Sequence, residues 1–475
     1  MRSSGSVDCL RFDSAALGGT TAFSYFIPLG CDPAESPPPE CPVLYYLHGT
    51  GGSYREGTSE AWVKALTHGP PVDPRTEAEP WQWADTGTWV EQAQPIDMIL
   101  VAPHGLTLPG GYGPKADQNP FWFDWNPRYA QGGDDQRYDT PAPRFHAHLV
   151  DELVPYVDAT FPTSGTREQR AIVGFSMGGI GALANGMRHP DVWASIGARS
   201  GGTFPFGAAT GVAPGPSAGP GVSPPVPVPH TRLPGVVPSY APEATWEVLY
   251  GTAATVGFGD FVADNVWWRQ TQPAELVTNA RARDAGGEQS VHIKYFVNDA
   301  VARRAEDLQG NPSAIYFEAI LYPTNLHLDE LFARHGVERT FDVGPGLHSG
   351  TYAVPYFREQ LEHQYARLRH RDGSGAPPPA AARFDYRSIE PDFTIWGWHV
   401  EVDRAAVEFL YLTDVSCAGM TLRGSGAVRV TPPPACGFGG SVDVDLGPSQ
   451  ATDEPVTGTA TSDGYGRTVT VSLDG

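Results

Sequence analysis

One serine of this chain stands in a sequence that could make it a nucleophile. Residues 171–179 read Ala-Ile-Val-Gly-Phe-Ser-Met-Gly-Gly, which places Ser176 at the centre of a Gly-x-Ser-x-Gly pattern. A short apolar run precedes the pattern and small residues follow it. This layout predicts a nucleophile elbow, a tight strand-to-helix turn that exposes the serine hydroxyl. The helix after Ser176 would direct its N-terminal amides and its positive dipole end at a reacting carbonyl oxygen.

A second Gly-x-Ser-x-Gly match surrounds Ser217, and its context differs. No strand-like run precedes residues 215–219, and prolines stand where a helix would have to begin. With 55 glycines in the chain, a chance match to so short a pattern arises roughly a third of the time. We therefore interpret residues 215–219 as loop.

A serine hydroxyl is a weak nucleophile at neutral pH, so it needs a neighbouring base, and the base needs an orienting acid. In an α/β-hydrolase these residues follow one another in the order serine, acid, histidine. His348 suits the base because it lies in a glycine-rich loop between a predicted strand at 340–343 and a predicted helix at 355–368. The histidines at poorer positions are His48, His189, His327 and His335.

Two carboxylates compete for the role of the acid. Asp299 follows a predicted strand at 291–297, where the acid of a hydrolase often stands, and Glu318 lies near the start of a predicted helix. The residues alone slightly favour Asp299 and leave both open.

An acyl-transfer site also needs two backbone N–H groups that hold the developing oxyanion. One is expected from Met177, the residue after the nucleophile. The other is expected from the glycine-rich turn at 48–52, where we choose Thr50, with Gly51 as the alternative.

The pattern of apolar runs predicts an α/β catalytic domain at 1–371, followed by a linker at 372–382 and an all-β, sandwich-like domain at 383–475. Strands are expected at 20–27, 43–47, 96–103, 169–173, 193–198, 291–297 and 340–343, with helices at 146–156 and 355–368. They imply a mostly parallel sheet flanked by helices, the α/β-hydrolase fold. A Pro/Gly-rich insertion at 203–245 interrupts this domain, either as a lid or as a surface loop.

Tryptophans leave two interpretations open. Trp396 and Trp398 of the C-terminal domain could be exposed for binding carbohydrate or an envelope component, or they could be core. An aromatic substrate cleft or simple core packing could equally account for Trp81, Trp83, Trp89, Trp122 and Trp125.

The composition of the chain limits the kinds of partner it can bind and indicates the cellular compartment in which it works. A formal charge of -22 over 475 residues argues against nucleic acid or an anionic membrane as a partner, and no apolar run is long enough to span a membrane.

The cysteines predict two local disulfides, Cys31 with Cys41 and Cys417 with Cys436, leaving Cys9 unpaired. Disulfides would imply export, so a signal peptide, not recognisable in residues 1–30, would have been removed. No metal-ligand spacing is present.

The chain resembles the esterase D, feruloyl esterase and antigen 85 mycolyltransferase family over residues 10–370. The resemblance rests on Leu-His-Gly at 47–49, the elbow at 174–179, His-Pro-Asp at 189–191, Ser-Gly-Gly at 200–202, Gly-Leu-His-Ser at 346–349 and Phe-Trp-Phe-Asp-Trp at 121–125. The last is similar to the family's Phe-Tyr-x-Asp-Trp segment.

The resemblance bears on the acid and on the reaction. The antigen 85 branch carries its triad glutamate in a Phe-Leu-Glu segment, and Tyr-Phe-Glu at 316–318 stands at the matching distance before His348. The resemblance thus implies Glu318 rather than Asp299. The mycolyltransferases have tryptophan where this chain has Gly350 and arginine where it has Gly51, which favours hydrolysis over mycolyl transfer.

We therefore expect an exported serine carboxylic-ester hydrolase that acts through Ser176, His348 and Glu318 and an acyl-enzyme, with no metal or organic cofactor. Its substrate would be a small-molecule or polymeric ester, including carbohydrate-linked esters. The alternatives are an acyltransferase that moves an acyl group to a sugar hydroxyl, and a non-catalytic protein that binds the cell envelope or carbohydrate.

Overall fold

The computed structural model describes residues 4–36, 38–50, 52–67, 95–105, 122–126, 143–202, 265–302, 312–353, 356–369, 381–405, 407–437, 439–448 and 467–472. The insertion predicted at 203–245 and most of the predicted linker at 372–382 lie outside these residues.

Eight strands form the large sheet of the N-terminal part. They are β1 (Val7–Ser14), β2 (Gly19–Phe26), β3 (Val43–Leu47), β4 (Ile99–Pro103), β5 (Arg170–Phe175), β6 (Ser195–Arg199), β7 (His292–Asn298) and β8 (Arg339–Gly344). The helices described with them are α1 (Glu60–Thr67), α3 (Phe145–Ala147), the π-helical η4 (His148–Leu153), α4 (Val154–Thr160), α5 (Met177–Arg188), α8 (Asn265–Arg269), α9 (Pro273–Leu276), α11 (Pro312–His335), α12 (Gly350–Ala353) and α13 (Phe357–Arg369). Short 3₁₀ turns are η1 (Leu29–Cys31), η5 (Arg167–Gln169) and η6 (Val277–Ala280).

The sheet is parallel except at one edge. Its strand order is β1-β2-β4-β3-β5-β6-β7-β8, with antiparallel pairing only of β1 with β2 and of β2 with β4. This is the order of the α/β-hydrolase sheet, so the predicted fold class is confirmed. The buried apolar runs of β3 and β5 fit this arrangement, because a parallel sheet is covered on both faces.

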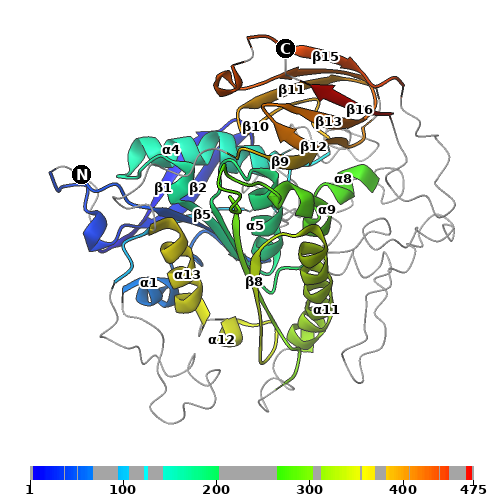
Figure 1. Ribbon diagram of the computed structural model, residues 1–475. Coiled ribbons are helices and arrows are strands. Elements are labelled where there is room, and N and C mark those ends of the chain that lie inside the picture. The colour runs from blue at the N-terminus through cyan, green and yellow to red at the C-terminus, as the bar shows by residue number, and fades with distance from the viewer. Residues whose placement is uncertain are drawn as a thin grey trace.

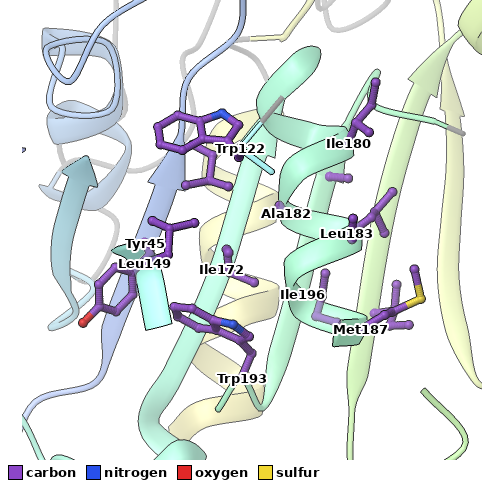
Figure 2. Close-up of a cluster of buried hydrophobic side chains, with 14 of the residues drawn as sticks. Tyr45, Trp122, Leu149, Ile172, Ile180, Ala182, Leu183, Met187, Trp193 and Ile196 are labelled. Carbon is purple, nitrogen blue, oxygen red and sulfur yellow. The ribbon is translucent and has the colours of Figure 1, made fainter. Parts of the chain in front are cut away.

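The two faces of the sheet carry separate cores. Tyr45 pairs in register with Ile172, and both side chains join the cluster under α5 that Figure 2 shows. The neighbouring pair, Tyr46 and Val173, joins the core under α1 and α13 on the other face. Alternate side chains of one strand therefore pack on opposite layers, which fixes the register of the strands.

The C-terminal part is all β, as predicted. Its strands are β9 (Phe384–Ser388), β10 (Asp392–Ile395), β11 (Trp398–Asp403), β12 (Leu410–Ser416), β13 (Gly419–Gly424), β14 (Ala427–Thr431), β15 (Val442–Asp445) and β16 (Arg467–Ser472), with the short turn η8 (Pro434–Cys436). They form two antiparallel sheets, β10-β11-β14-β15 and β16-β13-β12-β9, that enclose a common core (Figure 1).

The C-terminal tryptophans belong to this core. Trp396 and Trp398 are only 8% and 3% exposed, so they do not form the exposed aromatic surface that was one of the two interpretations. A turn at Trp396 and Gly397 separates β10 from β11. Trp396 and Gly397 both have positive φ, 52° and 81°, which makes a tight two-residue hairpin turn between the strands.

The C-terminal sheets pack on the α/β part through buried polar contacts. Glu275 of α9 pairs with Arg269 at 3.0 Å and with Arg387 of β9, and all three side chains are buried. Asn279 accepts a hydrogen bond from the N–H of Arg387 at 3.0 Å and donates one to its carbonyl. The adjacent arginines lower the pKa of Glu275 although its burial acts in the opposite sense. The interface is thus specified by charge as well as shape.

The same domain caps the C-terminal end of α5. The Tyr386 hydroxyl donates to the carbonyl of Arg188 at 2.8 Å, and the Arg188 guanidinium pairs with Glu390. This contact satisfies a carbonyl that a helix end leaves without an intrahelical partner. A helix of 12 residues is about 18 Å long, so the domain lies far from Ser176. In Figure 1 the C-terminal sheets are at the top and α12 is at the bottom.

Both predicted disulfides are confirmed. Cys31 bonds to Cys41, Cys417 bonds to Cys436, and Cys9 is an exposed free cysteine. In the described part of the chain, no helix is long and apolar enough to cross a membrane.

The buried cluster at Glu275 gives a stability prediction. Changing Glu275 to Gln leaves two buried guanidinium groups without their counter-charge, so we expect the free energy of unfolding to fall by about 3 kcal/mol or more. Urea denaturation measures this. Asp443→Asn is the matched control, because its partner Arg429 is exposed, and it should have little effect. Equal losses in the two variants would contradict the assigned role of the cluster.

Candidate active site

Ser176 lies on a strained turn between β5 and α5. Its φ of 55° and ψ of −123° are unusual for a residue with a side chain. The turn can close because of its flanking glycines. A Cβ on Gly174 would lie 2.1 Å from the carbonyl oxygen of Gly178, and one on Gly178 would lie 1.9 Å from that of Leu47. The Gly-x-Ser-x-Gly spacing is therefore a steric requirement of this turn.

His348 reaches Ser176 from the loop after β8. Its Nε2 lies 2.7 Å from the Ser176 Oγ, and its ring stacks on Phe175 with centroids 4.9 Å apart. Gly346, two residues earlier, has a φ of 111°, and a Cβ there would lie 2.1 Å from the Tyr352 ring. Only glycine lets the loop turn so tightly that the imidazole faces the elbow.

Glu318 comes from α11 and completes the line of hydrogen bonds. Its side chain is 0% exposed, and its Oε2 lies 2.7 Å from the His348 Nδ1. The second oxygen, Oε1, accepts the Ser200 hydroxyl at 2.7 Å and the Asn298 N–H at 2.6 Å. Each carboxylate oxygen thus has a partner, as burial of a charged group requires.

Asp299, the competing acid, has a different environment. Its Oδ1 accepts the N–H groups of Val301 and Gly346, each at 3.0 Å. These contacts order the loop that carries His348. The structure therefore places Glu318, and not Asp299, against the imidazole.

Ser200 is a site residue that sequence reasoning missed. It follows β6 with a φ of 40°, which is uncommon outside glycine and often marks a functional constraint. A Cβ on Gly201 would lie 2.6 Å from the backbone of Gly179, so the turn packs directly on the first turn of α5. In the sequence, Ser-Gly-Gly at 200–202 is one of the motifs that carry the family resemblance, and nothing in it indicates a contact with Glu318.

The turn after β3 lies beside the elbow. A Cβ on Gly49 would meet the Cβ of Ser176 at 3.2 Å. His48 is 1% exposed; its Nδ1 donates to the Gly49 carbonyl at 2.9 Å, and its Nε2 accepts the Gly105 N–H at 3.0 Å. Burial lowers the pKa of His48 to about 4, so its imidazole is neutral above that pH. Thr50 is described in this turn, and Gly51 lies outside the described residues.

The remaining sequence motifs support the fold around α5, mostly at the end of this helix remote from Ser176. Asp124 accepts the His146 N–H at 2.9 Å and contacts the same residue's ring at 3.3 Å, and that ring in turn bonds to His189 at the end of α5. Asp191 accepts the Trp396 N–H at 3.2 Å. The Phe-Trp-Phe-Asp-Trp and His-Pro-Asp motifs thus join elements around α5.

The structure describes two of the five tryptophans that could line a substrate cleft or pack in the core. Trp122 and Trp125 are buried in the α/β part and do not line an open cleft. Trp81, Trp83, Trp89 and Ser217 lie outside the described residues.

Chemically, the arrangement provides a hydroxyl, a base against it and a carboxylate that fixes the tautomer of the base. In that tautomer His348 carries its proton on Nδ1 towards Glu318 and offers a free Nε2 lone pair to Ser176. Within the described ranges, no group of three or more His, Cys, Asp or Glu side chains is placed to hold a metal ion.

Comparison with known proteins identifies a family. The model of the Esterase family, described as "Putative esterase", matches residues 113–368, which is more than half of the chain. A curated relative, "Endo-1,4-beta-xylanase/feruloyl esterase" of Xylanibacter ruminicola, is 38% identical over 63 residues. That alignment covers 13% of this chain and only 9% of the relative's length.

Two solved structures are among those that match this chain. An S-formylglutathione hydrolase from Agrobacterium tumefaciens is 14% identical, with 76% of this chain and 95% of the other covered, at a TM-score of 0.46. MPT51 of Mycobacterium tuberculosis is also 14% identical, with 77% and 100% covered, at a TM-score of 0.45.

The neutral, buried His48 predicts how stability depends on pH. The unfolded chain takes up a proton at the ordinary pKa of 6.5, whereas the folded protein resists it down to about 4. Stability is therefore lost as the pH falls through this window, by about 3 kcal/mol from this group. His48→Gln keeps a donor and an acceptor but does not titrate. Urea denaturation between pH 6.5 and 4 should show a smaller acid loss in this variant, and an identical loss would contradict the assignment.

Proposed function

Because the chain belongs to the Esterase family and carries a serine, a histidine and a glutamate joined by hydrogen bonds, we propose that it is a serine carboxylic-ester hydrolase. The observation that carries the proposal is the pair of hydrogen bonds that joins the three side chains. His348 Nε2 lies 2.7 Å from Ser176 Oγ, and His348 Nδ1 lies 2.7 Å from Glu318 Oε2. Family membership supports the reaction class, and this geometry supports the choice of residues.

In the proposed reaction, Ser176 Oγ attacks the ester carbonyl carbon while His348 Nε2 takes the hydroxyl proton. The tetrahedral intermediate collapses when His348 returns that proton to the leaving alcohol. Water then attacks the acyl-enzyme with His348 again as base, which releases the carboxylic acid and regenerates Ser176. Throughout, Glu318 accepts the Nδ1–H of His348 and stabilises the imidazolium that forms transiently.

We assign the oxyanion hole to the N–H groups of Met177 and Thr50. Met177 begins α5, so its amide is one of the N-terminal groups without an intrahelical acceptor. Thr50 follows Gly49, which lies against Ser176. Two such donors typically account for a large share of catalysis by acyl-transfer enzymes.

The substrate is a carboxylic ester. Hydroxycinnamate esters such as feruloyl esters are the first class to test, because the relative from Xylanibacter ruminicola is described as an endo-1,4-beta-xylanase/feruloyl esterase. We also propose that the protein is exported, which the two disulfides support.

The C-terminal domain, for which we propose the boundaries 383–475, acts as a rigid support at the far end of α5. Its buried tryptophans and its ionic contacts with the α/β part favour this role over that of a carbohydrate-binding module. We propose residues 1–371 as the catalytic domain and 372–382 as the linker.

Hydrolysis of p-nitrophenyl esters, from acetate to palmitate, and of methyl ferulate tests the proposed function. The wild type should hydrolyse at least one of them, and Ser176→Ala should lose activity by a factor on the order of 10⁵ or more because the nucleophile is gone. Circular dichroism of the variant controls for folding. Equal activity in the variant, or no hydrolysis of any ester by the wild type, would contradict the proposal.

A further inference from the structure

The peptide that carries the proposed Thr50 donor is held from its carbonyl side. The Gly49 carbonyl accepts the His48 Nδ1–H at 2.9 Å and the Gly52 N–H at 3.0 Å. A trans peptide is planar, so the Gly49 carbonyl and the Thr50 N–H point in opposite directions. Fixing one therefore fixes the other.

A carboxylate holds the same turn from its N-terminal side. Glu56 Oε1 accepts a hydrogen bond from the Tyr46 hydroxyl at 2.7 Å, and the backbone N–H of Gly49 favours the ionised carboxylate by lowering its pKa. Its Oε2 would lie only 2.2 Å from a Cβ on Gly52. Glu56 thus contacts the turn at both of its glycine ends, and Gly52 needs its missing side chain to admit the carboxylate.

Glu56 is itself positioned by the sheet. Its donor Tyr46 belongs to β3, is buried and packs on Trp62 with ring centroids 4.6 Å apart. Two residues further on, the Thr58 hydroxyl donates to Ser24 of β2 at 2.7 Å. Burial raises the pKa of Glu56, and the hydrogen bonds from Tyr46 and Gly49 oppose that rise. Both bonding partners are donors, so the ionised carboxylate suits the site.

We propose that Glu56 is a positioning residue of the oxyanion hole. It packs against Gly52, whose N–H holds the Gly49 carbonyl, and in this way it fixes the direction of the Thr50 N–H. This rests on the proposed function. Glu56 does not touch the substrate. It sets the orientation of a donor that is needed only when the carbonyl oxygen becomes an oxyanion.

A positioning role and a merely structural role differ in what they change. A misdirected oxyanion donor weakens binding of the transition state and leaves ground-state binding nearly unaltered, so kcat falls and KM does not. A structural loss lowers the unfolding temperature without this selectivity. A boronic acid, which forms a tetrahedral adduct with the active-site serine, reports the same difference at equilibrium.

The test uses Glu56→Gln in the full-length chain. Its amide can accept only one of the two donors, and its NH₂ group faces the other. We expect kcat to fall by ~10- to 100-fold, somewhat less than for deletion of a donor, while KM changes by no more than about threefold. Phenylboronic acid should bind more weakly by a factor similar to the loss in kcat. Tyr46→Phe should show the same pattern with a smaller loss.

Glu152→Gln is the matched control. Glu152 also accepts one hydroxyl, from Ser14 at 2.5 Å, and one backbone N–H, from Ala16 at 2.9 Å, but it lies on η4 and its Oε2 additionally contacts His148 Nδ1 at 3.1 Å. This variant should lose stability and keep the kcat and boronate affinity of the wild type.

The outcomes separate the two proposals. If Glu56→Gln and Tyr46→Phe behave like Glu152→Gln while Ser176→Ala is inactive, the proposed function stands and the role of Glu56 is wrong. If Ser176→Ala retains activity, both are wrong. If Glu56→Gln does not fold, the kcat, KM and boronate affinity of Tyr46→Phe decide.

Discussion

The central constraint of this structure is the burial of the Glu318 carboxylate. A fully buried charge is tolerated only when it is surrounded by donors. Glu318 finds them in three separate parts of the chain, namely the Ser200 hydroxyl, the Asn298 N–H and the His348 imidazole. The end of β6, the end of β7 and the loop after β8 must therefore converge on α11, and a parallel sheet brings such ends to one edge.

The end of β6 connects the three members of this site. The Arg199 carbonyl accepts the Ser176 N–H at 2.9 Å, and the Arg199 guanidinium bonds to the carbonyls of Ala353 and Tyr356 beyond His348. Ser200 holds Glu318. Arg199 and Ser200 thus bind Ser176 and Glu318 directly, and Arg199 also holds the segment that follows His348. Burial lowers the pKa of Arg199 to about 9, although the nearby carboxylates of Glu359 and Asp342 act in the opposite sense, and its guanidinium lies over the Phe296 ring.

Local signals account for what could be predicted from the sequence. The elbow glycines around Ser176 and the alternating C-terminal strands leave a mark within a few residues, and the closely spaced cysteine pairs predicted their disulfides. Features that depend on tertiary contacts left no such mark. The alternation of residue types along a strand does not show which face packs in the core, so the sequence left open whether Trp396 is buried or exposed. A generic rule slightly favoured Asp299, and only the family resemblance pointed to Glu318. The contacts of Ser200 and Glu56 join segments far apart in sequence and have no local signature.

The most direct test of this account compares Glu318→Gln with Asp299→Asn. Both changes remove one charge, and Asn at position 299 keeps the oxygen that accepts two N–H groups. The esterase kcat should fall by ~10³- to 10⁴-fold in Glu318→Gln, because the imidazole loses its oriented tautomer, and by no more than about threefold in Asp299→Asn. A severe loss in Asp299→Asn with near-normal turnover in Glu318→Gln would contradict the account.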